Sequence, residues 1–283
     1  MEMAKTIKSV RALVQAARGQ GKKIGLVPTM GALHIGHVSL IEAAARQTDF
    51  VVVSIFVNPT QFGPGEDLQE YPRPFEQDLR ICREQGVDVV FAPTPAEMYP
   101  GENFTWVTVE KLTESLCGQF RPGHFRGVAT VCAKLFNIVQ PDVAFFGQKD
   151  AQQAVVIRRM VADLDMPLAI VVCPTVREPD GLAMSSRNQY LSPSQRKDAA
   201  YIYKSLQKSR QMIEAGEKDT AKITAEMRKI LNQVPSMKIE YVSIVDAQTL
   251  QSVDRIAGEV LAAVAVKIGS PRLIDNILVD ASK

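Results

Sequence analysis

At residues 24–37 the chain reads Ile24-Gly25-Leu26-Val27-Pro28-Thr29-Met30-Gly31-Ala32-Leu33-His34-Ile35-Gly36-His37. The apolar start is typical of a buried strand, and the apolar spacing at 39–45 predicts a helix after the turn. Two of the three histidines of the chain therefore lie where a strand gives way to a helix. The first N–H groups of a helix are unpaired, and the positive end of its dipole favours anions. We predict that the chemistry of this protein takes place at this junction.

Taken alone, the histidine pair also fits two simpler kinds of structure. One is a strand–turn–helix connection with two surface histidines. The other is a metal site, since neutral imidazole binds zinc, but no cysteine or third histidine lies nearby to complete the ligand set. A zinc site is therefore disfavoured.

Strand-like and helix-like segments alternate along the first part of the chain. This alternation predicts a Rossmann-like, doubly wound parallel α/β sheet, whose ligands bind beyond the carboxyl ends of the strands. Segment 93–101 is expected to be a loop and 105–109 a short strand, and Glu76 and Asp78 are expected to be surface charges. The expected strands are 24–27, 50–57, 87–91, 142–146 and 168–172, and the expected helices are 7–17, 39–45, 73–85, 128–139 and one from Ala151.

The alternation stops after the fifth strand. Two long helices, at 193–215 and 220–231, are followed by three strand-like segments, at 238–245, 259–268 and 272–278. We therefore predict two domains, with a Rossmann-like domain at 1–176 and a smaller C-terminal α+β domain at 177–283.

Composition narrows the classes of protein. The chain has 283 residues, 46% of them hydrophobic and 23% charged, which is enough for a sizeable core without disulfides. The four cysteines are scattered, which favours reduced thiols and a cytoplasmic protein. A net charge of +2 without a long basic run argues against extended nucleic-acid binding. No signal peptide or long apolar segment is apparent, so we expect no membrane association.

Other loops after predicted strands, or near the domain boundary, carry groups that suit anionic or polar ligands. Asn58 and Gln61 offer uncharged amides, and Gly147 with Lys149 suits a phosphate. The hydroxyl and guanidinium groups of 185–187 suit phosphate oxygens. The basic turn 121–127 is either an anion-facing corner or an exposed loop. Each loop alone is equally an ordinary polar connection, so their joint occurrence is the stronger signal.

Longer segments carry a resemblance to a known family. The turn at 28–37 is similar to the HIGH signature of the nucleotidylyl-transferase superfamily. Together with 56–62, 121–128, 146–150 and 174–188, it makes the chain resemble the pantoate–β-alanine ligase (pantothenate synthetase) family over nearly its full length. Two positions depart from the family pattern, namely Thr60, where methionine is frequent, and Gln148, where glutamate is equally frequent.

The resemblance implies a reaction in two steps. The carboxylate of (R)-pantoate attacks the α-phosphate of ATP, giving bound pantoyl adenylate and pyrophosphate. The amine of β-alanine then attacks the acyl carbon, which releases pantothenate and AMP. The resemblance also implies Mg²⁺ with the ATP, a homodimer, and a smaller domain that closes as a lid over the site.

Roles for individual residues follow from the same resemblance. His37 is the expected proton donor beside His34, and Lys149 with the cluster Ser185, Ser186 and Arg187 is expected to act on the outer phosphates. The implied substrate residues are Gln61, Gln153 and Asn58, and Asp78 is a magnesium candidate by family position. The residues implied for ATP binding are Met30, Gly31, Ala32, Leu33, His34, Ile35, Gly36, His37, Gly147, Gln148, Lys149, Asp150, Val176, Met184, Ser185, Ser186 and Arg187.

Three alternatives remain at this point. Another small adenylyltransferase would share the histidine turn but release a dinucleotide. A class I aminoacyl-tRNA synthetase is disfavoured, because the chain lacks the length and basic surface for an anticodon-binding domain. A regulatory nucleotide-binding module would bind ATP without releasing pyrophosphate.

Overall fold

The structure is a computed structural model, and it describes residues 1–281. The chain divides into two compact units, and each is described by itself. The first unit consists of residues 1–113, 118–148 and 153–174, and the second consists of 114–117, 149–152 and the chain from 175 onward.

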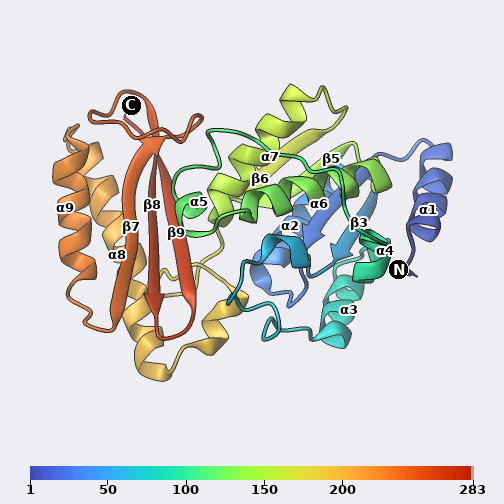
Figure 1. The fold of residues 1–283 in the computed structure, drawn as a ribbon, viewed down its shortest axis with the longest axis horizontal. Coiled ribbons are helices and arrows are strands. Elements are labelled where there is room, and N and C mark those ends of the chain that lie inside the picture. The colour runs from blue at the N-terminus through green and yellow to red at the C-terminus, as the bar shows by residue number, and fades with distance from the viewer. Residues whose placement is uncertain (282–283) are drawn as a thin grey trace. The chain divides into compact units, whose positions relative to one another are not determined.

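A six-stranded parallel sheet forms the centre of the first unit (Figure 1). Its strand order is β1-β4-β3-β2-β5-β6, so the chain runs outward from β2 in both directions. Ligands of such sheets bind outside the carboxyl ends of the strands where the order reverses, here β2 and β5. The strands are β1 (Glu2–Ala4), β2 (Ile24–Thr29), β3 (Phe50–Ile55), β4 (Val89–Phe91), β5 (Val143–Gly147) and β6 (Ala169–Cys173).

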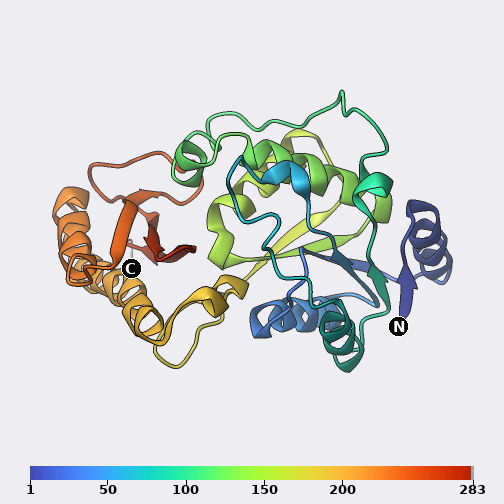
Figure 2. The ribbon, with the colours of Figure 1, turned by 60° about the horizontal axis from the view of Figure 1, so that its bottom comes forward.

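Helices cover both faces of this sheet. One core contains side chains of α1 (Ile7–Gly19), α6 (His124–Val139) and α7 (Ala151–Asp163). The other contains side chains of α2 (Ile35–Gln47) and α3 (Phe75–Glu84). Figure 2 shows α2 and α3 on the opposite side of the sheet from α6. The sheet is therefore doubly wound, as predicted.

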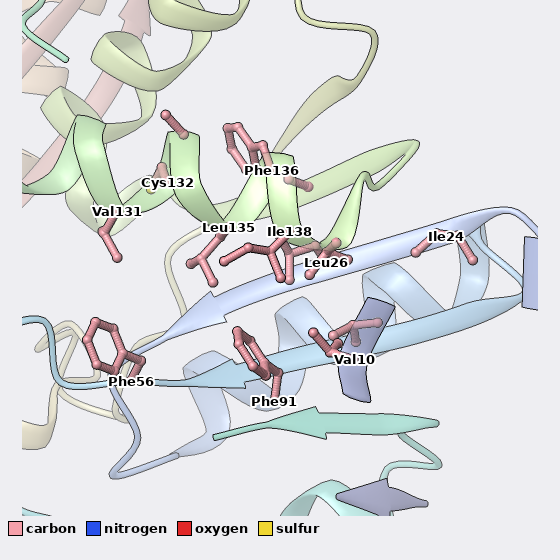
Figure 3. Close-up of a cluster of buried hydrophobic side chains, with 14 of the residues drawn as sticks. Val10, Ile24, Leu26, Phe56, Phe91, Val131, Cys132, Leu135, Phe136 and Ile138 are labelled. Carbon is pink, nitrogen blue, oxygen red and sulfur yellow. The ribbon is translucent and has the colours of Figure 1, made fainter. Parts of the chain in front are cut away.

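Successive residues of β2 point into different cores, as the two-residue period of a strand requires. Leu26 belongs to the core beneath α6, whereas Val27 belongs to the core beneath α2. Figure 3 shows Leu135 and Ile138 of α6 beside Leu26. Each such buried aliphatic side chain stabilises the fold by about 1.5–3 kcal/mol.

The second unit is built on an antiparallel sheet of three strands, in the order β7-β8-β9. Its strands are β7 (Met237–Asp246), β8 (Glu259–Ile268) and β9 (Arg272–Asp280). Helices α8 (Pro193–Glu214) and α9 (Thr220–Leu231) share a core with alternate residues of β8. Ser192 begins α8 with a reciprocal capping box, which explains why the sequence places this helix correctly.

Two local expectations are wrong, and one short strand is not predicted. Segment 105–109 is not a strand, because the N–H of Val107 donates to Thr130 Oγ1 of α6 and not to a neighbouring strand. The expected loop 93–101 contains the short helix α4 (Pro95–Met98), which Thr94 caps. Strand β1 was not expected, and it pairs in parallel with β4. The remaining short helices are α5 (Cys117–Phe120) and the 3₁₀ helices η1 (Pro59–Gln61), η2 (Gln148–Asp150) and η3 (Ser186–Tyr190).

Two expectations from composition can be compared with the structure. All four cysteines are buried and free, in agreement with reduced thiols. Among the helices of residues 1–281, none combines the length and the apolar character needed to cross a membrane.

Candidate active site

The turn that joins β2 to α2, residues 30–37 and hereafter the His turn, has an unusual backbone. Gly31 and Ala32 both have left-handed φ angles, +81° and +51°. A Cβ atom at Gly31 would lie 2.9 Å from Asp78 Oδ2 and 3.1 Å from Ile55 Cγ2. This position therefore needs glycine for its conformation and for the close approach of its neighbours.

The two histidines of the His turn cap the helix that follows them. His34 Nδ1 accepts from the N–H of Gly36 at 3.1 Å, and His37 Nδ1 accepts from the N–H of His34 at 3.3 Å. This is a capping box in which imidazoles replace the usual hydroxyl and carboxylate. The predicted helix at 39–45 consequently begins earlier, at Ile35, and both histidines belong to its start.

These hydrogen bonds determine the chemistry that the rings can perform. Since each Nδ1 atom accepts a backbone N–H, each neutral ring carries its proton on Nε2. The ring centroids lie 4.2 Å apart, with an angle of 46° between the ring planes. The His turn thus holds two adjacent imidazoles whose donors are their Nε2–H groups.

Asp78 of α3 supports the His turn from beneath. Its side chain is only 1% exposed, and its oxygens accept from the N–H groups of Ala32 at 2.9 Å and Leu33 at 2.7 Å. Burial raises the pKa of this carboxyl, although the two hydrogen bonds oppose the rise. The expectation that Asp78 is a surface charge is therefore wrong, whereas Glu76 is exposed as expected.

The surroundings of Asp78 bear on its suggested role as a magnesium ligand. Magnesium requires oxygen donors in near-octahedral geometry. Both Asp78 oxygens already accept backbone N–H groups. Within residues 1–281, no group of three or more His, Cys, Asp or Glu side chains is arranged to hold a metal ion. These donors do not fit a magnesium site. The observed contacts show that Asp78 instead stabilises the backbone of the His turn.

A buried amide network holds Gln61 beside the His turn. Asn58 is 1% exposed, and its Nδ2 donates to Gln61 Oε1 at 3.1 Å and to the carbonyl of Gly127 at 3.2 Å. Gln61 Nε2 in turn donates to Met30 Sδ at 3.0 Å. The structure therefore brings the loop after β3 against the loop after β2, and Asn58 orients the Gln61 amide.

The turn 121–127 holds the backbone of Gln61. His124 Nδ1 donates to the Gln61 carbonyl at 2.8 Å, and Arg121 Nη2 donates to it at 3.3 Å. Arg121 also donates to both carboxylate oxygens of Glu66, at 2.7 and 2.6 Å. Burial favours a higher pKa for Glu66, but the Arg121 contacts prevail and leave that pKa lowered.

These contacts decide whether the turn 121–127 is an anion-facing corner or an exposed loop. The arginines of this turn contact other residues of the first unit. Arg121 forms an ion pair with Glu66, and the Arg126 guanidinium stacks on the Trp106 ring at 4.5 Å. The turn also approaches the Gln61 loop so closely that a Cβ on Gly127 would overlap the carbonyl oxygen of Thr60. Its observed role is to support Gln61, and the sequence alone did not indicate this.

The second unit carries the remaining anion-suited residues. The Met184 N–H donates to the Val176 carbonyl at 3.0 Å, which closes a hairpin over residues 176–184. Ser185 follows directly and caps η3, since its Oγ accepts from the N–H of Arg187 at 3.3 Å. The hairpin therefore delivers Ser185, Ser186 and Arg187 as one compact cluster.

An arginine of α8 fixes the tip of this hairpin. Arg196 contacts Glu178 and Asp180, each at 2.5 Å. The hydrogen bond from Arg196 lowers the pKa of Asp180. Two carboxylates and one guanidinium thus add to the apolar packing that the hairpin gains from its buried Leu182.

The predicted site residues fall into two groups. The first unit brings together Met30, His34, His37, Asn58 and Gln61, and it also contains Gln153, half-buried in the first turn of α7. The second unit contains Lys149 together with Val176, Met184 and the cluster 185–187. The first group offers neutral donors suited to charge that develops during a reaction, and the second offers groups suited to phosphates.

Comparisons with known proteins agree over the whole chain. The family model described as pantoate-beta-alanine ligase matches residues 2–278. The pantothenate synthetase of Moorella thermoacetica is 55% identical over 282 residues, which cover 100% of both chains. That of Acetivibrio thermocellus is 53% identical, with 99% of this chain and 100% of the relative covered.

Solved structures give the same result. The crystal structure of pantothenate synthetase from Thermus thermophilus has a TM-score of 0.94 and 46% identity, covering 98% of this chain and 99% of that one. The pantoate-beta-alanine ligase from Francisella tularensis, complexed with beta-gamma ATP and beta-alanine, has a TM-score of 0.82 and 36% identity, covering 100% and 98%. The strand order, the His turn and these full-length matches lead to one conclusion: the chain belongs to the pantoate–β-alanine ligase family.

Proposed function

We propose that this enzyme condenses (R)-pantoate with β-alanine at the expense of ATP, through an enzyme-bound pantoyl adenylate. The observation that carries the proposal is the pair of imidazoles, His34 and His37, at the start of α2, in the turn whose Met30 accepts from the Gln61 amide. The relative from Francisella tularensis, complexed with beta-gamma ATP and beta-alanine, supports the choice of substrates.

In the first step, a pantoate carboxylate oxygen bonds to the α-phosphorus of ATP, and the bond to pyrophosphate breaks. Negative charge grows on the phosphoryl oxygens, so preorganised donors should dominate catalysis. The Nε2–H of His37 is suited to this task because its Nδ1 is held by the backbone. His34 is the second donor, and Lys149 with Ser185, Ser186 and Arg187 holds the outer phosphates.

In the second step, the β-alanine nitrogen bonds to the acyl carbon, AMP leaves with the bonding pair, and the amine loses a proton to solvent. The adenylate is already activated, so the protein mainly has to orient it and exclude water. The Gln61 and Gln153 amides would bind the hydroxyl and carboxylate groups of pantoate, with Asn58 fixing the first of them.

We propose that ATP is contacted by residues 30–37, 147–150, 176 and 184–187. Mg²⁺ would accompany the phosphates of ATP, whereas the donors around Asp78 do not fit it. We also propose a cytoplasmic homodimer, with a Rossmann-like domain at 1–176 and a lid domain at 177–283.

The order of product release tests the reaction. Stoichiometric enzyme is mixed with ATP and pantoate, pyrophosphate is followed, and β-alanine is added afterwards. We expect a single burst of pyrophosphate with pantoate alone, followed by steady AMP and pantothenate production once β-alanine arrives. Pyrophosphate that appears only with both acids present would contradict a separate adenylate step.

The same experiment separates the rivals. Another adenylyltransferase would not form AMP when pantoate and β-alanine are both added. It would join the nucleotide to a phosphate acceptor instead. A regulatory module would bind ATP and release no pyrophosphate with any acid. The matched control is ATP with β-alanine alone, which should give no burst because pantoate, whose carboxylate attacks ATP in the first step, is absent.

A further inference from the structure

Strand β9 holds the backbone of Lys149. Asn276 lies on this strand and is 5% exposed, and its Nδ2 donates to the Lys149 carbonyl at 2.9 Å. Both residues belong to the second unit. A buried amide that donates to a backbone carbonyl fixes the course of the chain at that residue, and so limits the directions in which the lysine side chain can extend.

The residue before Asn276 holds the hairpin that carries the hydroxyl and guanidinium cluster. Asp275 is 3% exposed and accepts two hydrogen bonds from Arg177, at 2.5 and 3.0 Å. Arg177 also donates to the Asn276 carbonyl at 3.2 Å and to the Gly181 carbonyl at 3.0 Å. Its guanidinium lies 4.0 Å from the centre of the Tyr203 ring. One arginine therefore joins the base of the hairpin to β9.

Strand geometry explains how two adjacent residues reach two separate segments. Successive side chains of a strand point to opposite faces, and β9 pairs regularly with β8 through Asp275 opposite Val264 and Asn276 opposite Ala263. Burial raises the pKa of Asp275, while Arg177 and, more weakly, the charge of Lys149 oppose the rise. Lys149 thus acts on this dipeptide through its charge and through its backbone.

We propose that Asn276 is a positioning residue for Lys149, and that the dipeptide Asp275–Asn276 sets the placement of Lys149 relative to the cluster Ser185–Arg187. The inference rests on the proposed function, in which both segments hold the outer phosphates of ATP. A misplacement of about 1 Å can reduce turnover up to about 10²-fold. A fixed carbonyl at Lys149 therefore has a direct effect on how ATP is held.

The test is the variant Asn276→Leu, which keeps the branching of the side chain, increases its volume and removes the Nδ2 donor. We expect the KM for ATP to rise about tenfold, the equivalent of one well-formed hydrogen bond, with the KM for pantoate within about twofold of wild type. The matched control is Ser209→Ala, which removes another buried hydrogen bond of the second unit, from Ser209 Oγ to the Leu206 carbonyl at 2.7 Å. The control should change neither KM.

A double-mutant cycle separates positioning from a merely structural role. If Asn276 acts through Lys149, adding Asn276→Leu to Lys149→Ala should not raise the KM for ATP any further. Effects that multiply in the double variant would overturn the inference, as would an unchanged KM in Asn276→Leu alone. If the leucine variant does not fold, Asn276→Asp keeps the side-chain shape and replaces the Nδ2 donor by an acceptor.

Calorimetric titration with ATP separates this inference from the proposed reaction. A wild-type enzyme that forms pantothenate, with unchanged ATP affinity in Asn276→Leu, would overturn the positioning role and leave the reaction intact. A wild-type enzyme that releases no pyrophosphate, but loses ATP affinity in the variant, would overturn the reaction and support the positioning role.

Discussion

The two units hold their functional groups by different physical means. In the first unit, the His turn and Gln61 are fixed by hydrogen bonds between buried groups and the backbone, as in the Asp78 contacts to Ala32 and Leu33. In the second unit, the hairpin 176–184 is held by the buried side chain of Leu182 together with the ion pairs of Arg177 and Arg196. The groups proposed to meet the reacting atoms thus have a geometry set by hydrogen bonds to the backbone, whereas the hairpin beside the groups proposed to hold the outer phosphates depends in addition on ion pairs.

The largest expected effect tests whether the first unit supplies donors or only geometry. His37→Ala should reduce pyrophosphate release about 10²-fold or more, the usual effect of losing one preorganised donor. His37→Asn should lose as much, because its amide can still accept the His34 N–H but offers no donor at the Nε2 position. Turnover near wild type in the asparagine variant, measured by pyrophosphate release, would mean that His37 only caps α2.

Substitution of Gln61 tests whether its loop contributes to pantoate binding without affecting ATP binding. Gln61→Ala should raise the KM for pantoate about tenfold, since a substrate hydroxyl or carboxylate loses one partner. ATP affinity, measured by calorimetry, should not change. Gln77→Ala, at an exposed position on α3 of the same unit, is the control and should behave as wild type. Equal losses for both substrates would show that the loop had collapsed.

Substitution of Asp78 tests how strongly its hydrogen bonds fix the His turn. Asp78→Asn replaces one acceptor by a donor, so one backbone N–H loses its partner and the free energy of unfolding should fall by about 1–3 kcal/mol. Burial raises the pKa of Asp78 above its usual value of 3.8. The native state therefore holds this proton more tightly, and the pH-dependent part of the Asp78 contribution, which is separate from its two hydrogen bonds, is full below about pH 3.8 and is lost as pH rises through the raised pKa. Urea unfolding of wild type and variant between pH 3 and 7 measures this difference.

Asp180 should give a pH dependence of stability opposite in sign to that of Asp78, and the smallest effect of the four. The hydrogen bond from Arg196 lowers its pKa below 3.8, so its stability contribution is present above that value and is lost as pH falls through the lowered pKa. Its side chain is 40% exposed, which weakens the pair. In wild type the free energy of unfolding should therefore fall slightly as the pH is lowered. In Asp180→Asn this small decrease should be absent, as measured by the same urea titration. A dependence of the same sign as for Asp78 would contradict the contrast between the units.

Most of the fold could be predicted because its long elements have strong periodic patterns. The apolar run of β3 and the capped helix α8 are examples. Strand β1 has only three residues and no pattern, and it is defined solely by its distant partner β4. The start of α2 was placed too late, because imidazole is not among the side chains that usually cap helices.

The candidate site could be outlined from the sequence where a motif is continuous, and not where the supporting residues lie far along the chain. The His turn and the cluster 185–187 are continuous. Asp78 and Asn276 act on residues 45 and 127 positions away, which no local pattern encodes. Helical periodicity placed Leu79 inward but could not decide the orientation of Asp78, its neighbour at the edge of the same buried face.

The pairing of β1 with β4 has a consequence for how the chain is made. Residue 2 pairs with residue 89, so β1 has no partner in the sheet until β4 has left the ribosome. On its other side β4 pairs with β3, so β1 completes that edge of the sheet. Pairings between distant segments form slowly and leave unpaired edges exposed in the meantime. Strand β1 should therefore need protection until β4 is available, whereas β4 leaves the ribosome after both of its partners, β1 and β3, have been made.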